Sequence, residues 1–233
     1  MDYKKNAKYF REKPSAKFIV IALIIALILL VIKAWIGVLA LIVLGVIGYY
    51  FITGRPMDYD IDKAAEEAMQ GLKQRALEKL GIDEDEVNAA TPISFWGYDF
   101  GKSPLNDKIF EGMKDTRGSD QVLRSPIIRA SFFFFSDKEV HYYYRISSLV
   151  SDTYIEGTDV FFYKYIVSVK TQTEEMPLYD RKTGNEIPGQ KVRFDSFSLR
   201  NAGGETTSCT VRDVSTVENS VKAMRNLLRE KQG

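Results

Sequence analysis

Apolar residues run from position 18 to position 52, and Lys33 is the only charged residue among them. One helix of these 35 residues would be about 52 Å long, whereas the hydrocarbon core of a bilayer is about 30 Å thick. A lysine inside such a span is costly, and a bend would place its ammonium group in water. We therefore predict a transmembrane helical hairpin, Phe18–Ile32 and Ala34–Ile52, with the bend near Lys33. The alternatives are a single span that uses part of the run and a cleaved signal peptide.

The pattern becomes amphipathic after position 60. Small and aliphatic residues recur every three or four positions, as in a helix with one buried face. Asp60 suits an N-cap and Gly81 a C-terminal cap, so we predict one helix between them. The simplest interpretation is a helix packed on the following domain, and the alternative is a partner-binding helix or a stalk. Its apolar positions are Ile61, Ala65, Ala68, Leu72, Ala76 and Leu80.

From Thr91 onwards, short aromatic and β-branched segments predict strands. The segment "SPIIRASFFFFSDKEVHYYYRISSLV" predicts a hairpin with its turn at residues 136–139, and "TDVFFYKYIVSVKTQ" predicts a further strand region. "EEMPLYDRKTGNEIPGQ" is predicted to be a turn-rich loop that encloses or flanks a short strand. "KVRFDSFSLR" and "ETTSCTVR" flank "NAGG", which predicts a second hairpin. The chain ends in an amphipathic helix whose apolar side is expected to bury against the sheet through Val217, Val221, Met224 and Leu228.

This order of elements, several antiparallel strands followed by one C-terminal helix, resembles the pleckstrin-homology-like (PH-like) fold, including its small bacterial membrane-associated versions. The resemblance covers about Ile127–Gln232 and rests on the order of elements, because no residue signature is specific. It implies an antiparallel curved sheet or partly open barrel with the final helix at one end. The predicted fold class is therefore a transmembrane helical hairpin plus an α+β domain of this type.

Four parts follow from these patterns. Residues 1–17 form a basic cytoplasmic tail, and residues 18–52 the transmembrane hairpin. Residues 53–90 form an acidic helical linker, and residues 91–233 the β-rich PH-like domain with its C-terminal helix.

The charges are balanced in total but unevenly placed. The chain carries 32 Lys and Arg against 31 Asp and Glu, which argues against a general nucleic-acid binder. Residues 1–17 contain six basic and two acidic residues, whereas residues 53–90 contain five basic and ten acidic residues. The positive-inside rule keeps the basic flank in the cytoplasm, and a hairpin returns the chain to the same side. We therefore predict a cell-membrane protein with two spans and a cytoplasmic C-terminal domain.

Candidate chemistry is sparse. The single cysteine, Cys209, cannot form an intrachain disulfide, and one cysteine with one histidine makes a zinc site of the usual kind untenable. His141 alternates with Tyr142 and Tyr144 along a strand, where a structural histidine is far commoner than a catalytic base. We predict no catalytic, cofactor-binding or metal residues and no cofactor.

The remaining patterns concern partners. The aromatic runs "FFFF" and "HYYYR" could stack on nucleic acid, but core packing is favoured. The basic residues of the final helix could contact anionic lipid, although a solvated face is the simpler interpretation; they are Lys222, Arg225, Arg229 and Lys231.

The leading hypothesis is a non-enzymatic integral membrane protein that presents a cytoplasmic β-rich module to a protein or lipid partner. The alternatives are a membrane-bound enzyme without a recognisable motif and a structural subunit of a membrane complex. An exposed sheet edge or groove would favour binding, and polar residues in a deep pocket would favour the enzyme.

Overall fold

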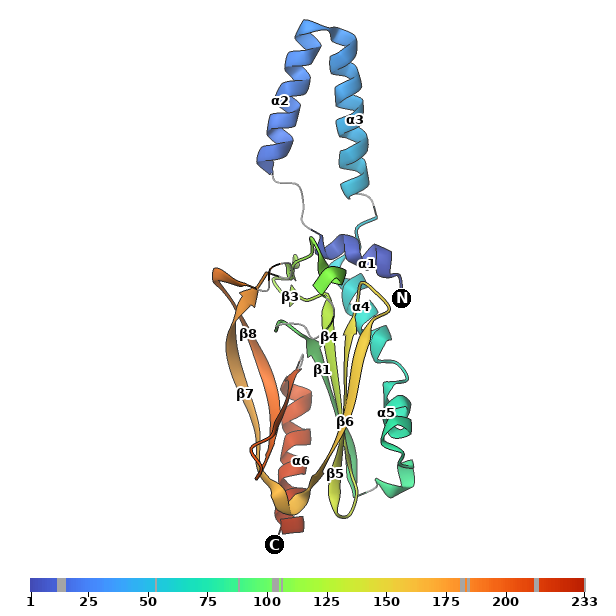
Figure 1. Cartoon of the computed structure of the whole chain (residues 1–233), viewed down its shortest axis with the longest axis vertical. Coiled ribbons are helices and arrows are strands. Elements are labelled where there is room, and N and C mark those ends of the chain that lie inside the picture. The colour runs from blue at the N-terminus through green and yellow to red at the C-terminus, as the bar shows by residue number, and fades with distance from the viewer. Residues whose placement is uncertain are drawn as a thin grey trace.

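The computed structural model describes residues 1–11, 16–52, 54–87, 89–101, 105, 107–180, 183, 185–211 and 214–232. Within these residues the chain forms a helical arm at one end and an α+β body below it (Figure 1). The body contains a four-stranded antiparallel sheet of order β1-β4-β5-β6, a three-stranded sheet of order β7-β8-β9 and a small β2-β3 ribbon. The strands are β1 (Ala90–Tyr98), β2 (Thr116–Arg117), β3 (Leu123–Arg124), β4 (Ile127–Phe135), β5 (Glu139–Ser148), β6 (Tyr154–Phe162), β7 (Ile166–Tyr179), β8 (Glu186–Asn201) and β9 (Thr206–Val211).

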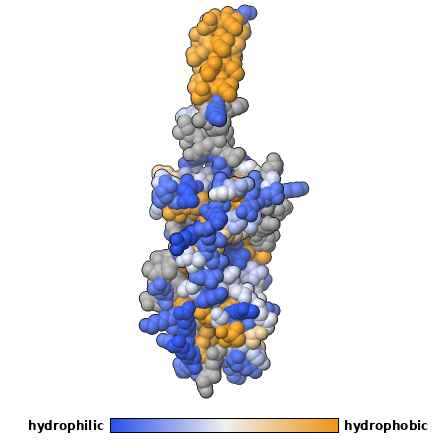
Figure 2. Space-filling view, turned by 90° about the vertical axis from the view of Figure 1, so that its left-hand side faces the viewer, coloured by the Kyte–Doolittle hydropathy of each residue, from blue (hydrophilic) through white to orange (hydrophobic). Residues whose placement is uncertain are grey.

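Two antiparallel helices, α2 (Ala16–Ile32) and α3 (Ala34–Ile52), form the arm, and the break between them falls at Lys33 as predicted. The helices approach closely at Gly37, where an added Cβ would collide with the backbone of Leu30. In Figure 2 nearly all of the arm's surface in view is hydrophobic, except for a hydrophilic spot at its tip. Most of its apolar side chains are exposed, Val31 to 85% and Trp35 to 69%.

The prediction of a transmembrane hairpin is nevertheless wrong. Among the described residues, no helix combines the length and the apolar character that crossing a membrane requires. The helices of the arm have 17 and 19 residues, whereas a bilayer core needs about 20. The same finding corrects three further predictions: that the chain is an integral membrane protein, that it has two spans, and that it lies in the cell membrane with a cytoplasmic C-terminal domain. The lone lysine located the helix break, but it did not establish what surrounds the helices.

The predicted hairpin around residues 136–139 is confirmed as β4 and β5. Their register places Phe134 opposite His141, and the turn is closed by the N–H of Ser136, which donates to the carbonyl of Glu139 at 3.0 Å. Because side chains alternate along a strand, the four consecutive phenylalanines divide between the two faces of the sheet. Phe133 and Phe135 enter the core between the sheets, and the other two pack under α5 (Leu72–Leu80).

The segment predicted as a turn-rich loop that encloses or flanks a short strand instead continues β7 and β8 into one long hairpin. Pro177 pairs with Lys191 and Tyr179 with Glu186, so only residues 180–185 connect the strands. The physical reason lies in the packing: Leu178 and Val192 are buried in a second core that also contains Tyr98. Turn-forming residues in the sequence were outweighed by burial of these apolar side chains.

The last helix, α6 (Val214–Gln232), lies between the two sheets (Figure 1). Val221, Met224 and Leu228 are buried in the core that both sheets share, as predicted, whereas the side chain of Val217 lies outside the described residues. The predicted curved sheet or partly open barrel is corrected to separate open sheets. The described strands form no closed barrel, because α6 fills the space between the sheets.

Two helices replace the single helix predicted between Asp60 and Gly81. α4 (Asp58–Met69) and α5 are separated at Gly71, whose positive φ of 73° turns the chain. Gly81 ends α5 in the left-handed conformation, as predicted. Asp60 is not the N-cap; it lies in the first turn of α4 and accepts a hydrogen bond from the N–H of Met57 at 2.9 Å.

The basic N-terminal segment contributes a helix, α1 (Tyr3–Phe10), that lies across the base of the arm (Figure 1). Phe10 is fully buried, and the side-chain amide of Asn6 donates to the carbonyl of Leu149 at 2.9 Å. Both ends of the arm therefore return to the body, since α1 precedes the arm and α4 follows it.

Candidate functional site

A network of charged side chains lies beneath the arm, where α4 meets the β2-β3 ribbon. Arg124, whose side chain is 2% exposed, binds the carboxylates of Asp62 and Asp120. Its Nε and Nη2 donate to Asp62 at 3.0 and 2.8 Å, and its Nη1 and Nη2 donate to Asp120 at 2.9 and 2.7 Å. A fifth bond runs from Nη1 to the carbonyl of Val122 at 3.3 Å. We call Arg124, Asp62 and Asp120 the arginine clamp.

Asp58 extends this network to α1. Its carboxylate accepts hydrogen bonds from the hydroxyl of Tyr9 at 2.6 Å and from the N–H and hydroxyl of Ser119, both at 2.7 Å. These bonds, that of Tyr9 foremost, lower the pKa of Asp58. The ribbon approaches so closely that a Cβ on Gly118 would lie 2.5 Å from Nη1 of Arg124 and 2.7 Å from Cγ of Asp58. A side chain at this position would push the clamp groups out of place.

The clamp borders an open cleft of about 680 Å³, but its chemistry is that of a structural joint. The five hydrogen bonds of Arg124 use the whole donor capacity of a guanidinium group. Hydrogen bonds from Arg124 lower the pKa of Asp120, so the pair stays ionised. The cleft thus presents charges that already neutralise one another, and they join α1, α4 and the ribbon at the base of the arm.

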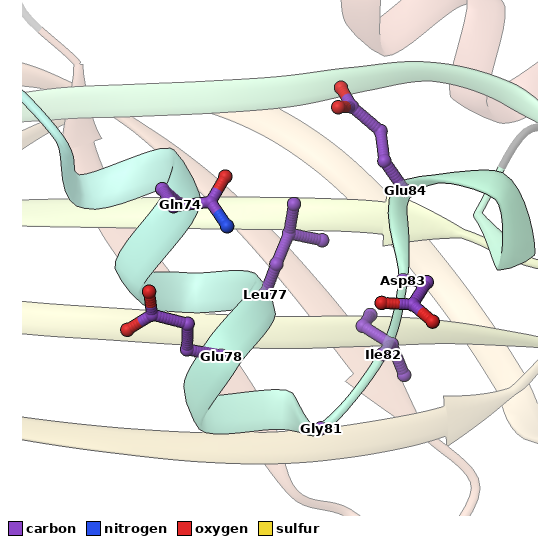
Figure 3. A pocket seen from close by; sticks show the side chains of 7 residues that line it. All are labelled: Gln74, Leu77, Glu78, Gly81, Ile82, Asp83 and Glu84. Atoms are coloured by element: carbon purple, nitrogen blue, oxygen red, sulfur yellow. The ribbon is translucent and has the colours of Figure 1, made fainter.

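A second hollow, of about 360 Å³, lies beside the C-terminal end of α5 (Figure 3). The end of the helix and the segment from Gly81 to Glu84 face each other across it, with Leu77 between them. Glu84 forms an ion pair with Lys73. In the part of the chain that the structure describes, no group of three or more His, Cys, Asp or Glu residues could hold a metal ion. The hollow is acidic and shallow, and it carries no further sign of a ligand.

The arm carries many of the exposed apolar side chains among the described residues, but it gives little information about function. A helix that is apolar on all sides has no single contact face that would define a partner. The contacts of the described residues do not identify what covers it, so we assign no role to it.

A smaller exposed apolar surface, unlike the arm, is formed by a few residues in fixed positions. It lies at the opposite end of the body from the arm, where the chain passes from β6 through the short helix η3 (Tyr163–Tyr165) into β7. Val160, Phe162, Tyr165 and Val167 are exposed by 41 to 61% within eight consecutive residues, and we call these four residues the apolar corner. The rings of Phe162 and Tyr165 meet edge to face at 6.4 Å.

The residues between these four hold the corner in place. Phe161, Tyr163 and Ile166 are buried in the shared core. The hydroxyl of Tyr163 donates to the carbonyl of Ser136 at 2.8 Å, and burial raises its pKa to about 12, so it remains a neutral donor. Register shifts between Ile166 and Ser168, which makes Val167 a bulge residue. Bulges re-aim side chains at sheet edges, and this one directs Val167 outward to 61% exposure.

The corner also joins the outermost strands of two sheets, β6 and β7. The β7 side is covered in part by α6, because Nε of Arg225 donates to the carbonyl of Val169 at 3.2 Å. On β6 the N–H of Val160 donates to the carboxylate of the preceding residue, Asp159, at 2.8 Å. Among the described strands, β6 pairs only with β5. Its outer edge is therefore where a further strand could add.

The residues singled out by the sequence lie elsewhere. His141 is buried in β5, with Nε2 3.5 Å from a carboxylate oxygen of Glu139. Cys209 is buried in β9, where burial raises the pKa of its thiol to about 12. Of the basic residues on the last helix, Arg225 contacts β7, and Lys231 pairs with Asp137 at 3.1 Å. None of them takes part in the clamp or the corner.

Sequence reasoning missed both features. The clamp joins Asp62 to Arg124 across 62 positions, and no local pattern indicates such a pair. The corner had a visible signal, because "VFFYKYIV" contains more apolar residues than one buried strand face can accommodate. That excess indicated that some of these side chains are exposed.

Comparisons with protein-family models, curated proteins and solved structures found no match for the chain. The resemblance to PH-like domains stays a prediction.

Proposed function

We propose that the body is a protein-binding module that takes an extended segment of a partner protein along the outer edge of β6. The observation that carries this proposal is the apolar corner: four exposed apolar side chains on a backbone fixed by buried neighbours. Exposed apolar patches rimmed by polar residues commonly mark interaction sites.

Two kinds of contact would cooperate at this place. An added strand would bond the main-chain groups along the edge of β6, as in other complexes formed by strand addition. Side chains of the same segment would cover Phe162 and Val167, which stand at the end of that edge. The fixed backbone favours binding, because little conformational entropy is lost on association.

Panning a library of random peptides against the intact protein tests this function. Peptides that are enriched should protect the amides of β6 from hydrogen exchange. They should bind at least about tenfold more weakly to Phe162→Asp, since that change puts a charge into the apolar contact. Tyr59→Asp is the matched control, because Tyr59 is 70% exposed on α4, away from the corner, and should leave binding unchanged.

Thermal unfolding of both variants separates a binding effect from misfolding. Enriched peptides that protect the cleft at the clamp instead of β6, or that bind equally well to Phe162→Asp, would contradict the proposal. Failure to enrich any peptide would contradict it as well.

A further inference from the structure

At the outer edge of β6, the N–H of Val160 is already bonded by a side chain of the same strand, that of Asp159. Backbone N–H groups of an antiparallel strand point alternately to its two sides. The N–H of Val160 donates to Oδ1 of Asp159, so it points away from β5 and toward the edge. By the same alternation, Thr158 and Phe162 direct their N–H groups outward. An incoming strand must therefore replace the Asp159 carboxylate with a carbonyl oxygen.

When an incoming strand displaces the Asp159 carboxylate from the N–H of Val160, the carboxylate loses favourable interactions. This carboxylate is exposed on the edge strand and accepts a hydrogen bond from the N–H of Val160. A strand laid beside it would remove water from the carboxylate as well as its hydrogen bond. Taking an ionised group out of water is costly unless an opposite charge compensates it.

The other acidic residue of β6 does not share this problem. Glu156 is bound by Arg75 at 2.9 Å, by Lys79 at 3.3 Å and by the hydroxyl of Tyr143 at 2.8 Å. Its charge is therefore neutralised by α5. The cation for Asp159 has to come from the incoming strand.

We propose that Asp159 is the specificity-determining residue of this edge, and that it selects an extended segment carrying a lysine or arginine among apolar residues. This inference rests on the proposed binding function and names its partner class. The apolar residues would lie on the corner, and the basic residue would pair with the carboxylate that leaves Val160. Charge on an edge strand also excludes strands without a compensating group.

A second copy of the chain fits this edge less well. Two β6 strands side by side would bring two Asp159 carboxylates to the same edge, and β6 contains no basic residue to pair with them. The charge pattern therefore favours a basic partner segment over self-association.

The test compares peptide selection on the wild-type protein, on Asp159→Asn and on Asp159→Lys. Wild-type selection should enrich lysine or arginine at one peptide position beside apolar residues. Asp159→Asn should lose that preference and bind the wild-type peptides about fivefold more weakly, the size of a partly exposed ion pair. Asp159→Lys should instead enrich aspartate or glutamate at that position. Raised salt should weaken the wild-type complex more than the Asp159→Asn complex.

The outcomes separate the two proposals. Peptides that protect β6 from exchange but show no basic preference would overturn the role of Asp159 and leave the binding function standing. Peptides that do not protect β6 would overturn both. Sedimentation at rising protein concentration tests for self-association. A dimer whose β6 amides are protected from hydrogen exchange would show that the partner of this edge is a second copy of the chain and not a basic segment.

Discussion

Two helices of equal length behave in opposite ways in this protein. α3 and α6 both have 19 residues, yet α3 exposes most of its apolar side chains, whereas α6 buries Val221, Met224 and Leu228 between two sheets. The difference lies in the arrangement of apolar residues and not in their presence. In α6 they recur at positions 221, 224 and 228, which is one face of a helix. In α3 they occupy every side, so the sequence defines no contact face. Apolar residues that recur on one side of a helix therefore predict a buried contact face, whereas apolar residues on all sides do not.

Truncating one leucine on each helix should give the largest contrast. Leu228→Ala removes a side chain that is 7% exposed in the shared core and should lower the free energy of unfolding by about 3 kcal/mol. Leu39→Ala removes one that is 58% exposed on the arm and should change it by less than about 0.5 kcal/mol. Denaturant unfolding, followed by the fluorescence of the body, measures both. Equal losses would show that the arm and the body form one core.

The arginine clamp should give the next largest effect. Arg124→Met keeps the volume of the side chain but leaves Asp62 without its guanidinium partner, so we expect a loss of about 2 kcal/mol. The value is moderate because Asp120 is 44% exposed and can regain water. Arg117→Met, on the neighbouring strand, is the control, since the guanidinium group of Arg117 donates to a neutral group, the carbonyl of Gln121. Matching losses in the two variants would mean that the clamp is an ordinary surface network.

The same contrast explains how far the sequence predicts this fold. The β4-β5 hairpin, the helix break at Lys33 and the burial of Met224 follow from local periodicity and turn chemistry, and all three are found. The continuation of β7 to Tyr179 depends on Leu178 reaching a core formed by distant elements, so local signals predicted a turn-rich loop with a short strand in or beside it instead of two long strands. Long-range packing overrides turn propensity in such segments.

The sites were less predictable for a related reason. A motif search finds residues at fixed spacing, whereas the clamp depends on how α4 meets the β2-β3 ribbon. At the corner, the excess of apolar residues is visible in the sequence, but which of them are exposed, Phe162 and not Phe161, depends on how the sheets are arranged. Nothing in the sequence indicated that Asp159 would cap the amide of Val160.

A smaller effect should appear on acidification. Burial would raise the pKa of Glu156, but hydrogen bonds from Arg75, Tyr143 and Lys79 outweigh it and lower the pKa to about 2. A lowered pKa in the folded state gives stability that is present above the unfolded value of 4.5 and is lost as the pH falls toward 2. The wild-type advantage over Glu156→Gln should therefore shrink across this range. Glu230→Gln, on the exposed side of α6, should follow the wild type throughout. A constant gap between wild type and Glu156→Gln would contradict the ionised contact with α5.

The smallest effect on stability should come from the largest deletion. The chain leaves the body at Arg11 and returns at Arg55, and Nη2 of Arg55 donates to the carbonyl of Arg11 at 2.7 Å. A short glycine-serine linker can therefore replace residues 12–54 without moving α1 or α4. Since none of the core clusters contains a described residue of the arm, the free energy of unfolding should change by less than about 0.5 kcal/mol. Binding of detergent micelles should fall sharply, because the exposed apolar surface of the arm is removed.

Both measurements are made in one buffer, with Phe10→Ala in the intact chain as the positive control for damage to the base. A large loss of stability on excision would show that the arm supports the body, and unchanged detergent binding would show that the body supplies the apolar surface itself.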